Sequence, residues 1–315
     1  MHAIEVEGLR KQFDPPNGPV AVDGLTFHIR EGEIFSLLGP NGAGKSTVIA
    51  ILSSLLMPDA GDARIGGYSI TREAEKVREL IGVVPQEVAL YEDLSGRENL
   101  LFWGRMYGLQ GATLESRVDA ILQLIGLADR QKDRVGKYSG GMKRRVNIGA
   151  ALLHQPRVLY LDEPTVGIDP QSRRAILEGV KDLNQQGVTV LYTTHYMEEA
   201  QELSDRIAII DHGGLIALGS HEELVHMVGE ATHVRIALDG AVEALAERWS
   251  HLPDVRQVTS EEEGRLSLLA DDATSLLPRL LEDAQALRAR ITEINLGAPT
   301  LETVFLHLTG RALRD

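Results

Sequence analysis

The sequence predicts an α/β domain followed by a smaller α+β domain, and three observations support this prediction. Over residues 3–220, short β-branched runs alternate with helical patterns. An apolar run that starts at Ile34 passes directly into a glycine-rich loop ending in Lys45-Ser46. The chain has 315 residues, which is long for one core and sufficient for two. We therefore expect domains at 1–229 and 230–315.

The first domain is expected to contain eight short strands and an inserted helical subdomain. The strand patterns are rich in β-branched residues and lie at 4–6, 25–29, 33–38, 62–65, 81–84, 158–161, 188–193 and 207–210. Between residues 93 and 153 helical spacing replaces them, with helices expected at 95–109, 113–125 and 141–154. The inserted subdomain is therefore placed at about 87–154. The segment Asp211-His212-Gly213-Gly214 predicts a hairpin turn.

The second domain is expected to follow a helix over 221–228 and a polar joint at Gly229-Glu230-Ala231. Its patterns run in the order strand, helix, strand, strand, helix, strand, at 234–238, 241–249, 255–258, 265–268, 277–287 and 290–294. This βαββαβ order is that of a ferredoxin-like domain. Pro278 is expected in the first turn of its helix, and a closing helix is expected over 301–308. The acidic run Glu261-Glu262-Glu263 is interpreted as a solvated hairpin tip, because adjacent residues do not converge on one metal ion.

Composition excludes several classes of function. The formal net charge is −14, with 46 acidic and 32 basic side chains, which argues against nonspecific nucleic-acid binding. The chain has no cysteine, so disulfides and thiolate metal sites are excluded. Residues 1–10 show no signal pattern, and no apolar run approaches the about 18 residues of a spanning helix. We expect a soluble chain for which any membrane role needs a partner.

The run Gly39-Pro40-Asn41-Gly42-Ala43-Gly44-Lys45-Ser46-Thr47 has the spacing of a P-loop. In such a loop the backbone N–H groups and the start of the next helix surround a phosphate. Lys45 would reach the β- and γ-phosphates, and the Ser46 hydroxyl would bind Mg²⁺. A glycine-rich turn without a ligand is the alternative, and the flanking strand and helix argue against it.

A second apolar run, 158–161, ends in two carboxylates, Asp162 and Glu163. A buried strand end must solvate or pair both charges, so such a pair is unusual without a function. Beside a P-loop it is interpreted as a Walker B motif. Asp162 would hold Mg²⁺ through water, and Glu163 would polarise the water that attacks the γ-phosphate. Taken alone, the pair is more typical of a helix-capping turn.

The segment Tyr138-Ser139-Gly140-Gly141-Met142 precedes a helix and offers N–H groups to an anion. Alone it would be an ordinary helix cap. Together with the two preceding motifs it makes residues 3–220 resemble the ATP-binding subunits of ABC transporters, which implies a P-loop NTPase fold of the ABC cassette type. Ser139, Gly140 and Gly141 match the family's signature. Tyr138 and Met142 replace its usual Leu and Gln, as in exporters of the daunorubicin-resistance type.

The resemblance implies further site residues and two cofactors, ATP and Mg²⁺. Gln86 matches the Q-loop glutamine, which would reach Mg²⁺ and the attacking water. His195 matches the switch histidine that contacts the γ-phosphate, and Asp169 matches the D-loop aspartate. Phe13 lies where the family stacks an aromatic ring on adenine, for which a phenyl face suffices.

The resemblance also implies partners. The chain has one P-loop and one signature, so a second copy or a paralogue would pair with it head to tail, with ATP between 39–47 of one subunit and 139–141 of the other. A separate transmembrane permease would dock near 86–94, with Phe102 and Trp103 as candidate lining. The implied location is cytoplasmic and peripheral, on the inner face of the cell membrane through the permease.

The implied function is that of an ATPase that powers transport through this permease. The tail at 298–310 resembles exporters of the daunorubicin-resistance type, so export is the expected direction. A non-transport ABC ATPase and a regulatory nucleotide-binding protein are the alternatives. A non-transport ABC ATPase would usually have a second cassette, a long coiled coil or a basic face, and the sequence shows none of these. A regulatory protein with an inactive site is disfavoured because the set Lys45, Asp162, Glu163 and His195 is intact.

Overall fold

The computed structural model describes residues 2–227, 232–260, 264–271, 273–297 and 300–310. The chain separates into two compact units, Met1–Ile216 and Ala217–Asp315, and each is described by itself. The joint expected at 229–231 lies outside the described residues, as does the acidic run at 261–263. The domain limits 1–229 and 230–315 therefore stay predictions.

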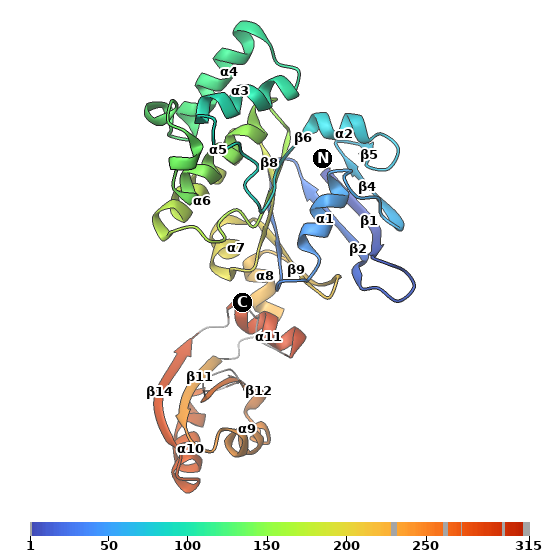
Figure 1. Ribbon diagram of the computed structural model, residues 1–315. Helices are drawn as coiled ribbons and strands as arrows, with labels where there is room; N and C mark the ends of the chain where they lie inside the picture. The colour runs from blue at the N-terminus through green and yellow to red at the C-terminus, as the bar shows by residue number, and fades with distance from the viewer. Residues whose placement is uncertain (1, 228–231, 261–263, 272, 298–299, 311–315) are drawn as a thin grey trace. The chain divides into compact units, whose positions relative to one another are not determined.

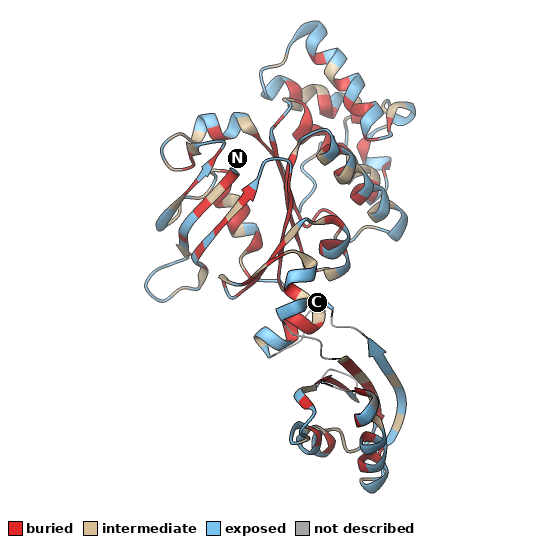
Figure 2. Cartoon of the chain, turned by 180° about the vertical axis from the view of Figure 1, so that it is seen from behind, coloured by how far each residue is buried: buried red, intermediate tan, exposed pale blue. Residues whose placement is uncertain are grey.

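A six-stranded sheet forms the centre of the first unit, in the order β10-β9-β3-β8-β7-β6. The adjacent pairs from β9 to β6 are parallel. Every residue of β3, β7 and β8 is buried, which fits parallel strands that are covered on both faces, and Figure 2 shows these strands as the buried centre of the unit. The strands are β3 (Ile34–Leu38), β6 (Ile81–Val84), β7 (Val158–Asp162), β8 (Thr189–Thr194), β9 (Arg206–Asp211) and β10 (Gly214–Gly219).

A separate antiparallel sheet has the order β2-β1-β4-β5. Its strands are β1 (His2–Gln12), β2 (Val20–Arg30), β4 (Ala60–Ile65) and β5 (Tyr68–Ser69). Buried and exposed residues alternate along parts of β2, as expected for a strand with one face on a core. In Figure 1 this sheet, in blue, and the green helices α3, α4 and α5 lie on opposite sides of the central strands.

Three α-helices lie between β6 and β7, where the helical subdomain is expected: α3 (Gly96–Met106), α4 (Gly111–Leu124) and α5 (Gly140–Leu152). They share a core that includes Leu100, Val118 and Val146. The predicted α/β class with inserted helices is therefore confirmed. The remaining helices of the unit are α1 (Lys45–Leu52), α2 (Ala74–Leu80), α6 (Pro170–Gln185) and α7 (Met197–Leu203). None of the described helices of the chain is long and apolar enough to cross a membrane.

The second unit contains a four-stranded antiparallel sheet in the order β12-β13-β11-β14. Its elements are α8 (His221–Met227), β11 (Thr232–Asp239), α9 (Val242–Ser250), β12 (Val255–Ser260), β13 (Arg265–Ala270), α10 (Ala273–Ala286), β14 (Arg290–Gly297) and α11 (Leu301–Thr309). Between α8 and α11 the order is the expected βαββαβ, and assignment to the ferredoxin-like class stays a prediction. One expectation is wrong: Pro278 lies inside α10, because buried Ala273 and Leu276 extend the apolar face of this helix toward its start.

Candidate functional site

One cavity of about 440 Å³ gathers residues that follow β3, β6, β7 and β8 at the carboxyl edge of the central sheet. This edge is where open parallel sheets bind ligands. Four of the predicted motifs contribute to it: the P-loop, Gln86, Glu163 and His195. The lining residues are Ala21, Asn41, Gly42, Gly44, Lys45, Ser46, Thr47, Gln86, Glu163, Val166 and His195.

The loop between β3 and α1 has the close packing and the free donors of a phosphate site. A Cβ on Gly44 would lie 2.2 Å from the carbonyl oxygen of Ala21, and this residue has a φ of +104°. A Cβ on Gly39 would lie 2.3 Å from the carbonyl oxygen of Ile210. No side chain caps the start of α1, so the N–H groups of its first turn are left for an anion. These features fit a bound phosphate chain.

Lys45, Glu163 and His195 form a connected group in this cavity. Lys45 is only 3% exposed, and its Nζ donates to the carbonyl oxygens of Gly39 at 2.7 Å and Pro40 at 2.9 Å. The same Nζ lies 2.9 Å from Oε1 of Glu163, whose Oε2 lies 3.1 Å from Nδ1 of His195. The carboxylate of Glu163 therefore lies between the ammonium of Lys45, at the start of α1, and the imidazole of His195, within hydrogen-bonding distance of both.

Thr193, which is not among the predicted site residues, contacts the carboxylate of Asp162 and the backbone of Glu163. Its hydroxyl donates to Oδ1 of Asp162 at 2.7 Å, and it accepts from the N–H of Glu163 at 3.0 Å. Glu163 has a φ of +44°, in the left-handed region that non-glycine residues rarely adopt. Asp162 and Thr193 are register partners in β7 and β8, and this adjacency is the signal that could have revealed the contact.

Four of the remaining predicted residues lie at the starts of α5 and α6 and do not line the described cavity. Ser139 caps α5, where its Oγ accepts from the N–H of Met142 at 3.2 Å, and Gly140 and Gly141 begin that helix. Asp169 caps α6 by accepting from the N–H of Ser172 at 2.9 Å, and this hydrogen bond lowers the pKa of the Asp169 carboxyl. Both side chains therefore cap a helix within their own chain, and this capping is compatible with a contact to a second chain.

Phe13 and Asp162 also lie outside the described lining of the cavity. Phe13 follows β1 and is 40% exposed, so its ring face is accessible. Asp162 is buried at the end of β7 beside Thr193. The lining therefore contains nine of the predicted site residues, from the P-loop and from positions 86, 163 and 195. The P-loop residues Gly39, Pro40 and Ala43 are not part of it.

Arg144 on α5 is a second buried residue that is not among the predicted site residues. It is 3% exposed, and its guanidinium donates to the carbonyl oxygens of Pro85, at 2.7 Å, and Gln86. Burial lowers the pKa of the Arg144 guanidinium, although the negative charge of Asp162 acts to raise it. The helix that begins with the signature is thus tied directly to the backbone of the Q-loop.

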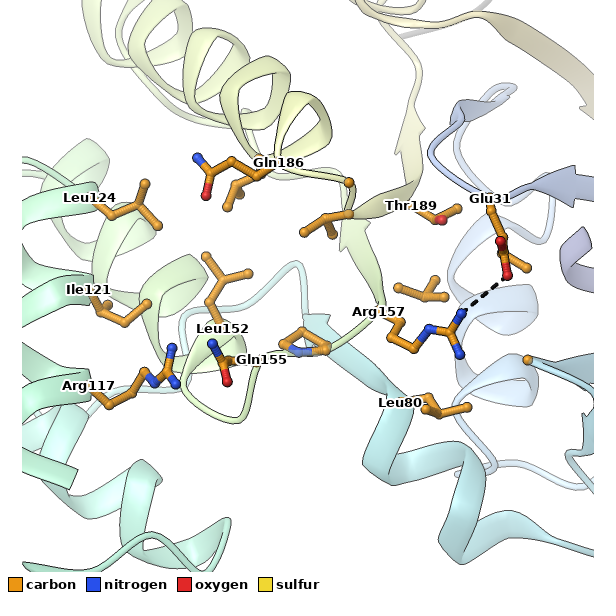
Figure 3. A pocket seen from close by; sticks show the side chains of 17 residues that line it. Glu31, Leu80, Arg117, Ile121, Leu124, Leu152, Gln155, Arg157, Gln186 and Thr189 are labelled. Atoms are coloured by element: carbon orange, nitrogen blue, oxygen red, sulfur yellow. Dashed lines mark hydrogen bonds and ion pairs between the residues drawn. The ribbon is translucent and has the colours of Figure 1, made fainter. Parts of the chain in front are cut away.

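A different cavity, of about 400 Å³, lies at the opposite ends of the core strands (Figure 3). Val158 and Thr189, the first residues of β7 and β8, belong to its lining. Arg157 pairs there with Glu31 at 3.2 Å. None of the predicted site residues is among the described positions that line it, whereas nine of them line the cavity at the carboxyl edge.

Comparisons with known proteins agree with this geometry. Residues 22–166 match the family model described as ABC transporter. The chain is similar to the linearmycin resistance ATP-binding protein of Bacillus subtilis, with 45% identity over 99% of this chain and 100% of the relative. It is also similar to a doxorubicin resistance ATP-binding protein of Mycobacterium tuberculosis, with 42% identity over 98% of this chain and 93% of the relative.

Two solved structures extend the comparison to the fold. An ATP binding subunit of an ABC transporter is 31% identical, with a TM-score of 0.64 over 72% of this chain and 93% of that chain. An ATP-binding cassette described as a dimer in a post-hydrolysis state bound to ADP and Pi is 27% identical, with a TM-score of 0.63 over 69% of this chain and 98% of that chain.

Proposed function

The chain belongs to the ABC transporter family, and on that premise we propose that it is the ATP-hydrolysing subunit of an exporter whose permease is a separate protein. As a member with the cassette fold it is an ATPase. The observation that carries the proposal is the connected group of Lys45, Glu163 and His195 in the P-loop cavity. Export of an antibiotic-like molecule is supported by the names of the relatives.

Each of the predicted catalytic and metal-binding residues has a part in hydrolysis under this proposal. Lys45 and the N–H groups of α1 would bind the phosphates. Ser46, Gln86 and Asp162 would hold Mg²⁺, which when bound neutralises phosphate charge. Glu163 would accept a proton from the attacking water, and His195, in contact with Glu163, would hold the γ-phosphate.

We propose that a second copy or a paralogue completes the site. Ser139, Gly140 and Gly141 lie at the start of α5 and outside the described lining of the P-loop cavity, which supports a contact with the nucleotide of another subunit. The similarity to a cassette solved as a dimer bound to ADP and Pi also supports this arrangement. Phe13 would stack on the adenine, and Asp169, before α6, would face the partner subunit.

The permease is proposed to dock beside the Q-loop, which would hold the subunit at the cytoplasmic face of the membrane. Tyr91 is 50% exposed, and its ring meets Phe102 edge to face at 4.9 Å between centroids. Phe102 in turn contacts Trp103 at 5.5 Å between centroids. These rings lie on the segment that follows Gln86 in the chain and on α3, and Arg144 connects the backbone of Gln86 to α5.

The test is ATP hydrolysis by the purified full chain with Mg²⁺. Glu163→Gln keeps the size of the side chain but removes the proton acceptor, so its rate is expected to fall by about 10²- to 10⁴-fold while ATP still binds. Glu198→Gln is the matched control, because Glu198 is exposed and lies outside the described cavity. Equal rates for the wild type and Glu163→Gln would contradict the proposed role of the site.

A further inference from the structure

Glu199 on α7 is a buried carboxylate with no part in the reaction described above. It is 3% exposed, while its neighbour Glu198 is exposed. We propose that Glu199 is a positioning residue, which fixes the loop of His195 against the segment that follows Glu163. This inference rests on the proposed function, since it concerns the geometry of the same hydrolysis site.

One carboxylate oxygen of Glu199 accepts hydrogen bonds from three hydroxyl groups. Its Oε2 accepts from Thr165 Oγ1 at 2.9 Å, Tyr192 Oη at 2.8 Å and Thr194 Oγ1 at 3.0 Å. Thr165 lies two residues after Glu163, and Thr194 directly precedes His195. The carboxylate therefore joins the Walker B segment to the switch segment through one atom.

The other oxygen connects the same carboxylate to α6. Its Oε1 lies 3.4 Å from Nε of Arg173, whose guanidinium lies over the ring of Tyr196 at 4.5 Å from the centroid. The N–H of Tyr196 donates to Oγ1 of Thr194 at 2.9 Å. His195 is thus held between Thr194 and Tyr196, and both of these residues are tied to the pair formed by Glu199 and Arg173.

The arrangement requires a charged carboxylate at position 199. The recorded neighbours supply three hydroxyl donors and a cation, which suit an anion with two acceptor oxygens. Burial and the negative charge of Glu199 raise the pKa of Tyr192, which keeps that hydroxyl protonated and able to donate. A glutamine has the same shape, but it loses the charge facing Arg173 and turns an N–H group toward groups that donate.

Loss of the Glu199 charge is therefore expected to lower turnover and to change nucleotide affinity little. The recorded partners of Glu199 include no residue of the P-loop, so the phosphate cradle stays intact when the carboxylate is neutralised. The contact at risk is the 3.1 Å contact between His195 and Glu163. A misplacement near 1 Å at reacting groups costs about 10²-fold in rate.

The experiment measures kcat, KM for ATP and thermal stability of the full chain with Mg²⁺. Glu199→Gln and Thr194→Val are each expected to lower kcat by about 10²-fold, with KM within about twofold of the wild type. Thr194→Ser keeps the hydroxyl, so its kcat is expected to be close to that of the wild type. The double variant Glu199→Gln/Thr194→Val is expected to be no slower than the worse single variant, because both changes break one link. Glu198→Gln on the same helix is the matched control.

Three results would overturn the positioning role: wild-type kcat in both Glu199→Gln and Thr194→Val, a rise in KM that accounts for the loss, or additive losses in the double variant. If Glu199→Gln does not fold, the comparison of Thr194→Val with Thr194→Ser decides, because both retain the carboxylate. A wild-type chain without ATPase activity would overturn the proposed function together with this inference. An active wild type with unchanged variants would overturn this inference alone.

Discussion

The ion pair between Lys45 and Glu163 is expected to contribute measurably to the folding of the first unit when no nucleotide is added. The two side chains are 3% and 5% exposed, and Nζ lies 2.9 Å from Oε1. A hydrogen bond to a charged group contributes about 1.5–3 kcal/mol, and a buried charge left without its partner costs about 3–5 kcal/mol. Because Glu163 also contacts His195, we expect the lower part of these ranges. The coupling energy between the two residues should be about 2 kcal/mol.

The assay is a double-mutant cycle with Lys45→Met, Glu163→Gln and the double variant, followed by urea unfolding. Trp103 and Trp249 are the two tryptophans of the chain, so a Trp249→Phe background leaves the fluorescence of Trp103 as a probe of the first unit. The pair formed by Lys181 and Glu202 has the same 2.9 Å separation, but both side chains are 35% exposed.

This more exposed pair provides the control, because its two charged atoms lie at the same distance in a solvated setting. Its coupling energy should stay below about 1 kcal/mol, as for most surface ion pairs. A coupling between Lys45 and Glu163 no larger than that of the exposed pair would refute the reasoning. The buried contact would then contribute no more to the free energy of unfolding than a pair of solvated charges does.

Three further predictions concern other parts of the chain. Arg144→Lys should lower the rate of ATP hydrolysis by about tenfold, because an ammonium cannot donate to the carbonyl oxygens of Pro85 and Gln86 in the same way as a guanidinium. An unchanged rate would argue against a functional role for this contact with the Q-loop. Burial lowers the pKa of His154 in the folded chain, so below about pH 6.5 the unfolded chain binds more protons and the folded state loses stability. The melting temperature of His154→Gln should therefore fall less than that of the wild type between pH 7.5 and pH 5. The fragment 1–229 should still bind ATP in calorimetric titrations, and a fragment that is folded by circular dichroism yet does not bind would assign part of the site to the second unit.

The central strands could be predicted from the sequence because buried parallel strands are short and almost entirely apolar. The separate sheet formed by β1, β2, β4 and β5 could not, because its pairings join residues far apart in the chain: His2 pairs with Arg30, and Ile4 with Ile65. Helix α6 was also missed. Its buried residues, which include Ile176, Val180 and Leu183, form a narrow stripe on a segment that is otherwise polar.

The candidate site was predictable where a motif follows a strand. Lys45, Glu163 and His195 were identified individually, and the adjacency of β3, β8 and β7 brings them together. Glu199 could not be found in this way, because a glutamate in the run Glu198-Glu199 of a short helix has the pattern of a solvated surface. Only the folded structure places three hydroxyl donors around it.

We propose that ATP is bound between the P-loop of one subunit and the signature of another. The most direct measurement is the mass in solution of the Glu163→Gln variant with Mg²⁺ and ATP, by light scattering after size-exclusion chromatography. We predict a shift from 34.5 kDa to twice that value, and no shift when Ser139→Arg is added, although both variants bind ATP. A Glu163→Gln chain that binds ATP but keeps the mass of a single chain would contradict the account, and so would a Ser139→Arg double variant that dimerises equally well.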